Sequence, residues 1–316
     1  MKPIELVTQA LELIAALATA PLFLGWVNRC RAWLQNRRAP SLWLPYRGIR
    51  KLFHKDAVIA ENASPIFRAA PYIVFGAMLV AAGIIPSMGT RLPFTAAADA
   101  IALVGLLAVA RVFLSLAAMD IGTAFGTLGA RREMMVGFLA EPALLMVIFV
   151  ASLISATTAL PAITENLATQ ALGLYPSLAF TAVAFTLVML AENARIPIDN
   201  PATHLELTMI HEAMVLEYSA RHLALMEWAA ALKLFNYACI GFALFVPWGV
   251  STGSGGPLAL AASIPLLAVK LTVAGAGLAL IETLSAKLRV FRAPEFLATA
   301  FLFAVLGLLV HLLLGG

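Results

Sequence analysis

A run of acidic and histidine side chains between Ala191 and His222 contrasts with the apolar sequence on either side of it. Carboxylate and imidazole groups can transfer protons and bind metal ions. This run is therefore the first place to look for chemistry in the chain. Its five acids and three histidines are Glu192, Asp199, Glu206, Glu212, Glu217, His204, His211 and His222.

A metal centre is one interpretation of this run, and a solvated acidic loop is another. His211 and Glu212 are adjacent, but no second histidine follows at the HExxH spacing of zinc hydrolases. Apolar residues such as Leu205 and Met209 alternate with the acids, which indicates a partly buried helix beginning at Thr203. We therefore assign no metal site and no cofactor to this chain, and predict that the run holds carboxylates next to a membrane.

Seven charged side chains fall inside long apolar segments, where burying each one costs about 2.5–3.5 kcal/mol. Those near a segment end could reach the interface, while the alternative is a set of inward-facing pairs that relays protons or cations. Both signs of charge occur at similar depth, which favours the relay. The seven are Glu12, Arg111, Glu141, Glu192, Lys233, Lys270 and Glu282.

The composition identifies the kind of protein that must position these groups. The chain is 62% hydrophobic and 12% charged, with a mean hydropathy of +0.93, which predicts an integral membrane protein. Its two cysteines, Cys30 and Cys239, are too few for a typical iron–sulfur cluster or a closed zinc site. GxSxG, P-loop and dinucleotide motifs are absent, so no covalent catalysis is predicted.

Apolar segments of about 20 residues predict an all-α membrane domain over residues 1–316, with about eight transmembrane helices. The first segment is interpreted as a retained span, because its basic residues follow the apolar run instead of preceding it. The eight expected spans are Ile4–Val27, Ile66–Ser87, Ala96–Met119, Met135–Leu160, Tyr175–Glu192, Glu227–Gly249, Leu258–Glu282 and Phe296–Leu314.

Basic residues gather in the connections after the first, third, fifth and seventh spans. The positive-inside rule therefore places these connections in the cytoplasm and both termini outside. Two of them, about 28–65 and 193–226, are long, and the first contains a predicted short amphipathic helix near residues 47–53. The positive charge is thus a topology signal, not a nucleic-acid site. Its residues Arg37, Arg38, Arg47 and Arg50 are candidates for contact with a soluble partner.

Several motifs together resemble the complex I subunit 1 family, which includes a membrane component of bacterial NADH–quinone oxidoreductase. Within it, they are most similar to the branch formed by the membrane subunits of energy-converting nickel–iron hydrogenases. The motifs are Asn36-Arg-Arg-Ala-Pro40, Met119-Asp-Ile-Gly-Thr-Ala-Phe125, Gly129-Ala-Arg-Arg-Glu133, Glu141-Pro142, Glu192-Asn-Ala-Arg-Ile-Pro-Ile-Asp199, Glu206-Leu207 and Glu217-Tyr-Ser219.

The resemblance implies a subunit without an active site of its own that couples electron transfer to proton or sodium movement. By position, it assigns coupling to Glu141, Glu192, Arg195, Asp199, Glu206, Glu217 and Glu282. With the other charged residues of the spans and of the acidic run, the full candidate set adds Arg111, Asp120, Glu212, Lys233 and Lys270.

The same resemblance implies partners in the bilayer of a bacterial or archaeal cytoplasmic membrane. They are the large and small hydrogenase subunits and iron–sulfur subunits, which would carry the nickel–iron centre and the clusters, and antiporter-like membrane subunits. Two alternatives stay open, a quinone-site subunit of an NADH–quinone oxidoreductase and a standalone ion transporter. Ile198 replaces the family's usual phenylalanine, which points away from quinone.

Overall fold

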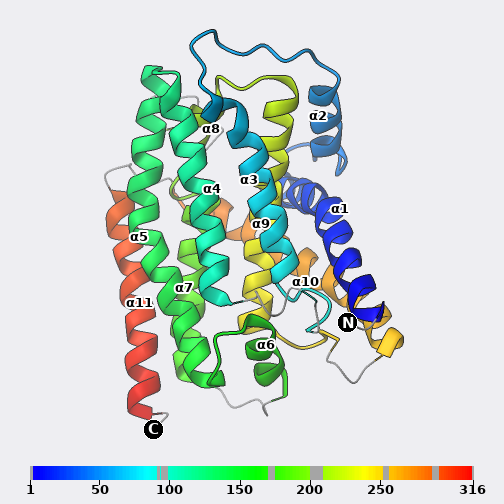
Figure 1. Ribbon diagram of the computed structural model, residues 1–316. Coiled ribbons are helices and arrows are strands. Elements are labelled where there is room, and N and C mark those ends of the chain that lie inside the picture. Colours follow the sequence, from blue (N-terminus) through cyan, green and yellow to red (C-terminus); the bar gives the residue numbers. More distant parts are fainter. Residues whose placement is uncertain are drawn as a thin grey trace.

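The computed structural model describes residues 3–90, 93, 99–169, 175–199, 209–251, 256–286 and 292–314. These residues form a bundle of helices (Figure 1). The helices are α1 (Pro3–Leu34), α2 (Leu44–Phe53), α3 (Pro65–Ile84), α4 (Ala100–Asp120), α5 (Ala124–Ser155), α6 (Leu160–Thr169), α7 (Pro176–Glu192), α8 (His211–Val215), α9 (Ala220–Phe245), α10 (Gly256–Leu284) and α11 (Ala293–Leu314).

The architecture confirms the predicted all-α membrane protein. Within the described residues, seven helices are long and apolar enough to cross a membrane: α1, α3, α4, α5, α9, α10 and α11. The remaining predicted span, Tyr175–Glu192, corresponds to α7, which is apolar but has only 17 residues. Which side of the membrane each end faces stays a prediction.

Several helices differ from the expected boundaries: α1 continues to Leu34 instead of ending at Val27, and α9 begins at Ala220 instead of Glu227. α5 begins at Ala124 instead of near Met135, because the Thr123 hydroxyl caps the helix by accepting the N–H of Gly126. The basic pair Arg131 and Arg132 therefore lies in helix and not in a connecting loop. The short helix α6 was not expected, since ten residues cannot span a bilayer.

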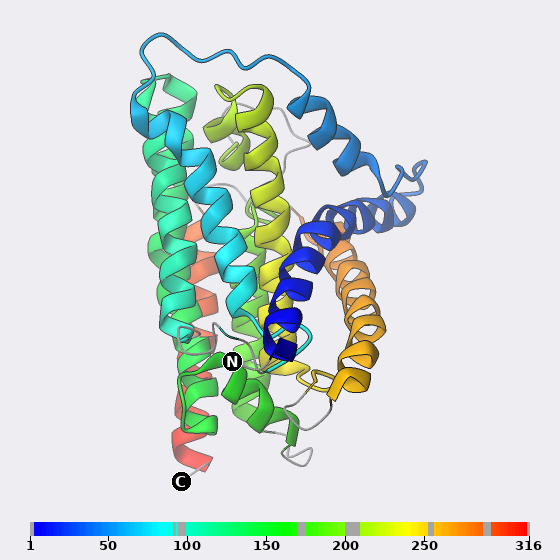
Figure 2. The ribbon, with the colours of Figure 1, turned by 45° about the vertical axis from the view of Figure 1, so that its right-hand side comes forward.

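Helix α9 lies at the centre of the bundle, whereas α10 and α11 lie at its periphery. In the most apolar 18-residue stretch of each helix, 67% of α9 is buried inside the bundle, compared with 28% of α10 and 22% of α11. α9 packs against α1, α2 and α3, while α5 packs against α4, α7 and α11. Figure 2 shows α1 and α10 side by side, set apart from the α4, α5 and α11 side of the bundle. Side chains of α9 can therefore reach both groups of helices.

The two ends of the bundle carry different structures. α2 and α8 lie at one end, and the N-terminus of α1 and helix α6 lie towards the other (Figure 1). α2 forms where the sequence predicts a short amphipathic helix. At the opposite end, the N–H of Thr90 donates to the carbonyl of Ser251 at 3.1 Å, and the N–H of Ser251 to that of Met88 at 2.8 Å. These bonds join the segments that follow α3 and α9.

Candidate functional site

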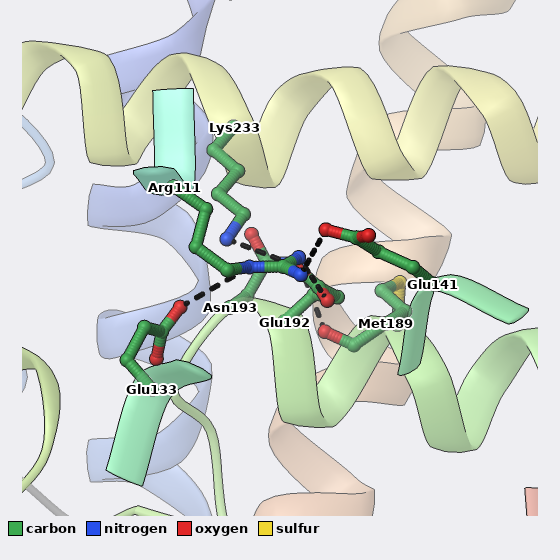
Figure 3. A network of polar contacts seen from close by, with 7 residues as sticks. All are labelled: Arg111, Glu133, Glu141, Met189, Glu192, Asn193 and Lys233. Atoms are coloured by element: carbon green, nitrogen blue, oxygen red, sulfur yellow. Dashed lines mark hydrogen bonds and ion pairs between the residues drawn. The ribbon is translucent and has the colours of Figure 1, made fainter. Parts of the chain in front are cut away.

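The charged side chains of three helices meet at Arg111 in the interior of the bundle (Figure 3). Arg111 on α4 is only 6% exposed. Its guanidinium group contacts Glu141 at 2.5 Å and Glu133 at 3.7 Å, both on α5, and also pairs with Glu192 at the end of α7. We call this set, together with Lys233, the Arg111 network.

Lys233 completes the network from α9, with its Nζ 3.1 Å from Glu192 Oε2. Glu192 therefore lies between two cations and links α4 to α9. The network holds two cations and three carboxylates, so it carries one more carboxylate than cation. An unbalanced charge in a buried site favours taking up a proton, because ionised groups are costly away from water. The arrangement is suited to holding and shifting protons.

The sequence of α5 makes room for the guanidinium group. Glu133, Gly137 and Glu141 recur every four residues, so they lie on one face of the helix. A Cβ atom at Gly137 would lie 2.8 Å from Arg111 Cδ, which is closer than such atoms approach. The missing side chain at Gly137 thus leaves room for Arg111 between the two carboxylates of α5, and we call this space the Gly137 notch.

A second group of charges forms around Glu282 on α10, which is 2% exposed. Arg195, in the connection after α7, contacts one of its oxygens at 3.2 Å, and Arg31 at the end of α1 contacts the other at 3.4 Å. Burial lowers the pKa of Arg195 from its usual value, and the Glu282 carboxylate opposes this shift. Glu282 therefore ties α1 and α10 to the connection after α7.

A cavity of about 300 Å³ separates the two groups of charges and is lined by both. Ten of its fifteen lining residues are charged or polar, and we call it the polar cavity. Glu192 and Lys233 face it from the Arg111 network, and Arg195 and Glu282 from the second group. A water molecule occupies about 30 Å³ of liquid volume, so this cavity has room for several. Water in this cavity would connect the two groups of charges by hydrogen bonds. The other charged or titratable residues in its lining are Arg31, Asp199, His211 and Glu212.

Asp199 and His211 shape the wall of this cavity. Asp199 is 3% exposed, and its Oδ2 accepts the N–H groups of Ile210 at 3.2 Å and His211 at 3.1 Å. It thereby fixes the start of α8. Burial, with the charges of Lys233 and Arg195, lowers the pKa of His211 to about 4. His211 is therefore neutral near pH 7.

Three further predicted coupling residues, Asp120, Lys270 and Glu217, lie away from the Arg111 network. Asp120 accepts the N–H of Ser64 at 2.8 Å and so fixes the start of α3. Lys270 donates to the carbonyl of Val246 at 2.6 Å, at the far end of the bundle. Glu217 is exposed, whereas Glu206 lies outside the described residues.

Two members of these groups were missed by the sequence analysis. Glu133 was assigned to a loop, and its four-residue spacing from Gly137 and Glu141 is the signal that could have identified it. Arg31 was counted only as part of the basic loop after the first span. Among the residues that the structure describes, no three His, Cys, Asp or Glu side chains are grouped to hold a metal ion. The candidate partner-contact residues Arg37, Arg38, Arg47 and Arg50 are all exposed.

Comparison with known proteins identifies relatives along nearly the whole chain. Formate hydrogenlyase subunit 4 of Escherichia coli K12 is 32% identical over 297 residues, which cover 94% of this chain and 95% of that protein. Hydrogenase-4 component C of the same strain is 35% identical over 242 residues, covering 75% and 74%.

A similar fold occurs in the membrane-bound sulfane sulfur reductase, an archaeal respiratory membrane complex. The matching chain of that complex superposes with a TM-score of 0.82 at 19% identity, covering 96% of this chain and 98% of that one. The family described as NADH dehydrogenase matches residues 8–313. The protein therefore belongs to the NADH dehydrogenase family, as its motifs predict.

Proposed function

We propose that this chain is the membrane-anchoring, energy-coupling subunit of a multisubunit, complex I-like nickel–iron hydrogenase. It links redox chemistry in a hydrophilic arm to the translocation of protons or sodium ions. The names of its two bacterial relatives, which refer to hydrogenase-4 and formate hydrogenlyase, support this function.

The observation that carries the proposal is the path of charge from the polar cavity to the side of the bundle. Glu192 faces the cavity and pairs with Arg111, which in turn pairs with Glu141. The side chain of Glu141 is 35% exposed, whereas that of Glu192 is 1% exposed. The network therefore begins inside the protein and ends on the lateral face of α5, where another membrane subunit can receive the signal.

Coupling follows from the sharing of cations in this network. Arg111 and Lys233 both form ion pairs with Glu192, so a change in the charge of a group lining the cavity weakens or strengthens these ion pairs. If Glu192 takes up a proton, Arg111 interacts more strongly with Glu133 and Glu141, whose protons are then released more easily. One proton entering at Glu192 thus favours one leaving at Glu141, and no redox group in this chain is needed.

The partners follow from the distribution of charge on the surface. Arg37, Arg38, Arg47 and Arg50 are exposed near α2, at the end of the bundle that also carries α8. In this proposal they bind the hydrophilic hydrogenase subunits and the iron–sulfur subunits, which hold the nickel–iron centre and the clusters. Antiporter-like subunits bind beside Glu141, and the assembly lies in a bacterial or archaeal cytoplasmic membrane.

A second cavity favours one alternative, a quinone-binding subunit. It measures about 620 Å³ and lies between α1, α2 and α9, with a mainly apolar lining that includes Leu24, Ile49 and Met226. His211 and Glu212 line both this cavity and the polar one. A mainly apolar cavity with a few polar groups in its lining suits a hydrophobic ring compound with oxygen substituents.

Purification of the intact complex from its native membrane distinguishes the two functions. We expect hydrogen evolution and co-purification with a nickel-containing subunit. Quinone-dependent activity that is sensitive to inhibitors, in a preparation without nickel, would instead support the alternative and overturn the hydrogenase assignment.

Substitutions in the charged groups test the coupling path itself. We expect Glu141→Gln, Glu192→Gln and Glu282→Gln each to reduce proton movement per hydrogen formed, while the complex still assembles. Glu295→Gln, at an exposed position on α11, is the matched control and should change nothing. Normal proton movement in all three variants would refute the path.

A further inference from the structure

A buried carboxyl group at the other end of the bundle has no part in the proposed coupling path. Glu12 lies in the first half of α1 and is 1% exposed. Its Oε1 accepts the N–H of Met88 at 2.8 Å and that of Gly89 at 2.9 Å. Met88 and Gly89 belong to the segment after α3, at the end of the bundle opposite α8 (Figure 1). Glu12 therefore fixes a connection at the end of the bundle opposite α8.

Within the described part of the chain, no basic side chain forms an ion pair with Glu12. The titratable neighbour is Cys239 on α9. Lys270 on α10 interacts with Cys239, and its ammonium group donates to the carbonyl of Val246. The segment 85–90 has no ionisable side chain, although Ser87 adjoins the carboxyl group. On α3, the titratable groups are near its far end, at Arg68 and Tyr72.

The second oxygen of Glu12 lies in a buried region where several polar side-chain atoms have no hydrogen-bond partner among the described residues. Oε2 is buried and has no hydrogen-bond partner among the described residues. The same holds for Oε1 of Gln9, one turn earlier on α1, and for the hydroxyl oxygen of Thr90, next to Gly89. The amide nitrogen of Gln9 donates to the carbonyl of Gly83 at 2.9 Å. A proton on Oε2 removes the negative charge of Glu12, which no basic side chain compensates among the described residues.

We propose that Glu12 is a proton-binding site at the end of the bundle opposite α8. The only chemical change is the addition of one proton to the carboxylate or its release to the adjoining aqueous phase. The two backbone N–H groups donate to Oε1 of Glu12 whether the carboxyl group is ionised or protonated. The protonated form also has an O–H group at Oε2 that can donate a hydrogen bond. The group therefore fits its pocket in both states.

The position of Glu12 brings this site near the Arg111 network. Cys239, which neighbours Glu12, follows Lys233 by six residues on α9, or about 9 Å along the helix axis. Asn236 and Tyr237 lie between these two levels, and both are fully buried polar side chains. Glu12, on α1, is thus a second proton site beside the central helix α9, and it is distinct from the lateral path to Glu141.

Infrared difference spectroscopy on the full-length protein tests the proposal. We expect a protonated-carboxyl band in the wild type at about pH 5 that is lost by about pH 9 and is missing from Glu12→Gln at every pH. Glu295→Gln is the control and should retain the band. Identical spectra for the wild type and Glu12→Gln would overturn the proposal.

Labelling with dicyclohexylcarbodiimide, which modifies protonated carboxyl groups in apolar surroundings, gives a second test without any variant. We expect Glu12 to be modified at about pH 6, and roughly fivefold less at about pH 9. Failure to label at both pH values contradicts the proposal. Protection by sodium chloride but not potassium chloride at constant pH would identify a sodium site and also overturn it.

These readouts do not depend on the hydrogenase function. Glu12→Gln preserves the oxygen that accepts from Met88 and Gly89, so we expect it to fold normally. If the Glu192 variants leave coupling unchanged, the proposed function fails while the Glu12 band is unaffected. If only the band is missing, the Glu12 proposal fails alone.

Discussion

The two ends of this bundle bury acidic side chains by different means. Towards the α8 end, Glu192 and Glu282 are each held by two basic side chains. At the opposite end, Glu12 is held by two backbone N–H groups, and no cation pairs with it among the described residues. Buried pairs make each charge depend on its neighbours, whereas a lone carboxyl group responds mainly to proton supply. In our proposals, the first arrangement transmits a signal across helices, and the second stores a proton locally.

Removing Arg111, the cation shared by three carboxylates, has the largest expected effect on stability. Arg111→Met leaves three carboxylates without their common partner, and breaking a buried ion pair in this way typically costs about 3–5 kcal/mol. We expect a much lower thermal midpoint and little assembled complex, measured by size-exclusion fluorescence in detergent. Arg111→Lys retains the charge and should recover part of the stability. Normal assembly of the methionine variant would mean that the network is not structurally required.

The same change of Glu to Gln at each end compares the two arrangements directly. Glu192→Gln removes the carboxylate that pairs with Lys233 and one of the three that pair with Arg111, so we expect a loss of about 2–3 kcal/mol. Glu12→Gln resembles the protonated acid and should change stability by less than about 0.5 kcal/mol. Thermal midpoints of the two variants check this difference. Equal destabilisation would contradict the contrast between paired and lone acids.

A substitution that changes no charge tests whether geometry matters in the network. Gly137→Ala places a Cβ atom against Arg111, so we expect about 1–3 kcal/mol of destabilisation and impaired proton coupling. Gly105→Ala is the matched control, because a Cβ atom there meets nothing within 4 Å. It should be neutral or slightly stabilising, since alanine favours helix. The same stability for both variants would show that the notch is not needed.

Lowering the pH has the smallest expected effect on stability, and this effect comes from His211 at the start of α8. The pKa of His211 is lowered to about 4 from a usual value of 6.5, so the folded protein binds this proton less well than the unfolded chain. The stabilisation from neutral His211 is complete above about pH 6.5 and is lost as the pH falls towards 4. We expect the thermal midpoint to fall over this range less in His211→Gln than in the wild type. His54→Gln, at an exposed position, is the control and should behave as the wild type.

Local sequence patterns predicted the features that depend on a single helix. Apolar segment length located the spans, including the short one that became α7, because a membrane helix must satisfy its own backbone groups. The motif around Glu192 indicated the family. The four-residue spacing of Glu133, Gly137 and Glu141 was also present in the sequence, yet it has meaning only once α5 is known to begin at Ala124.

Which charges meet was decided by tertiary packing. Arg111 and Lys270 look alike in the sequence, since each is a basic residue deep in an apolar span. Packing brings Arg111 to three carboxylates from two neighbouring helices, while Lys270 reaches a backbone carbonyl after α9. The sequence by itself determined a membrane protein with buried charges of both signs. Only the structure paired them, because ion pairs between helices depend on the rotation and depth of each helix, which its own residues do not specify.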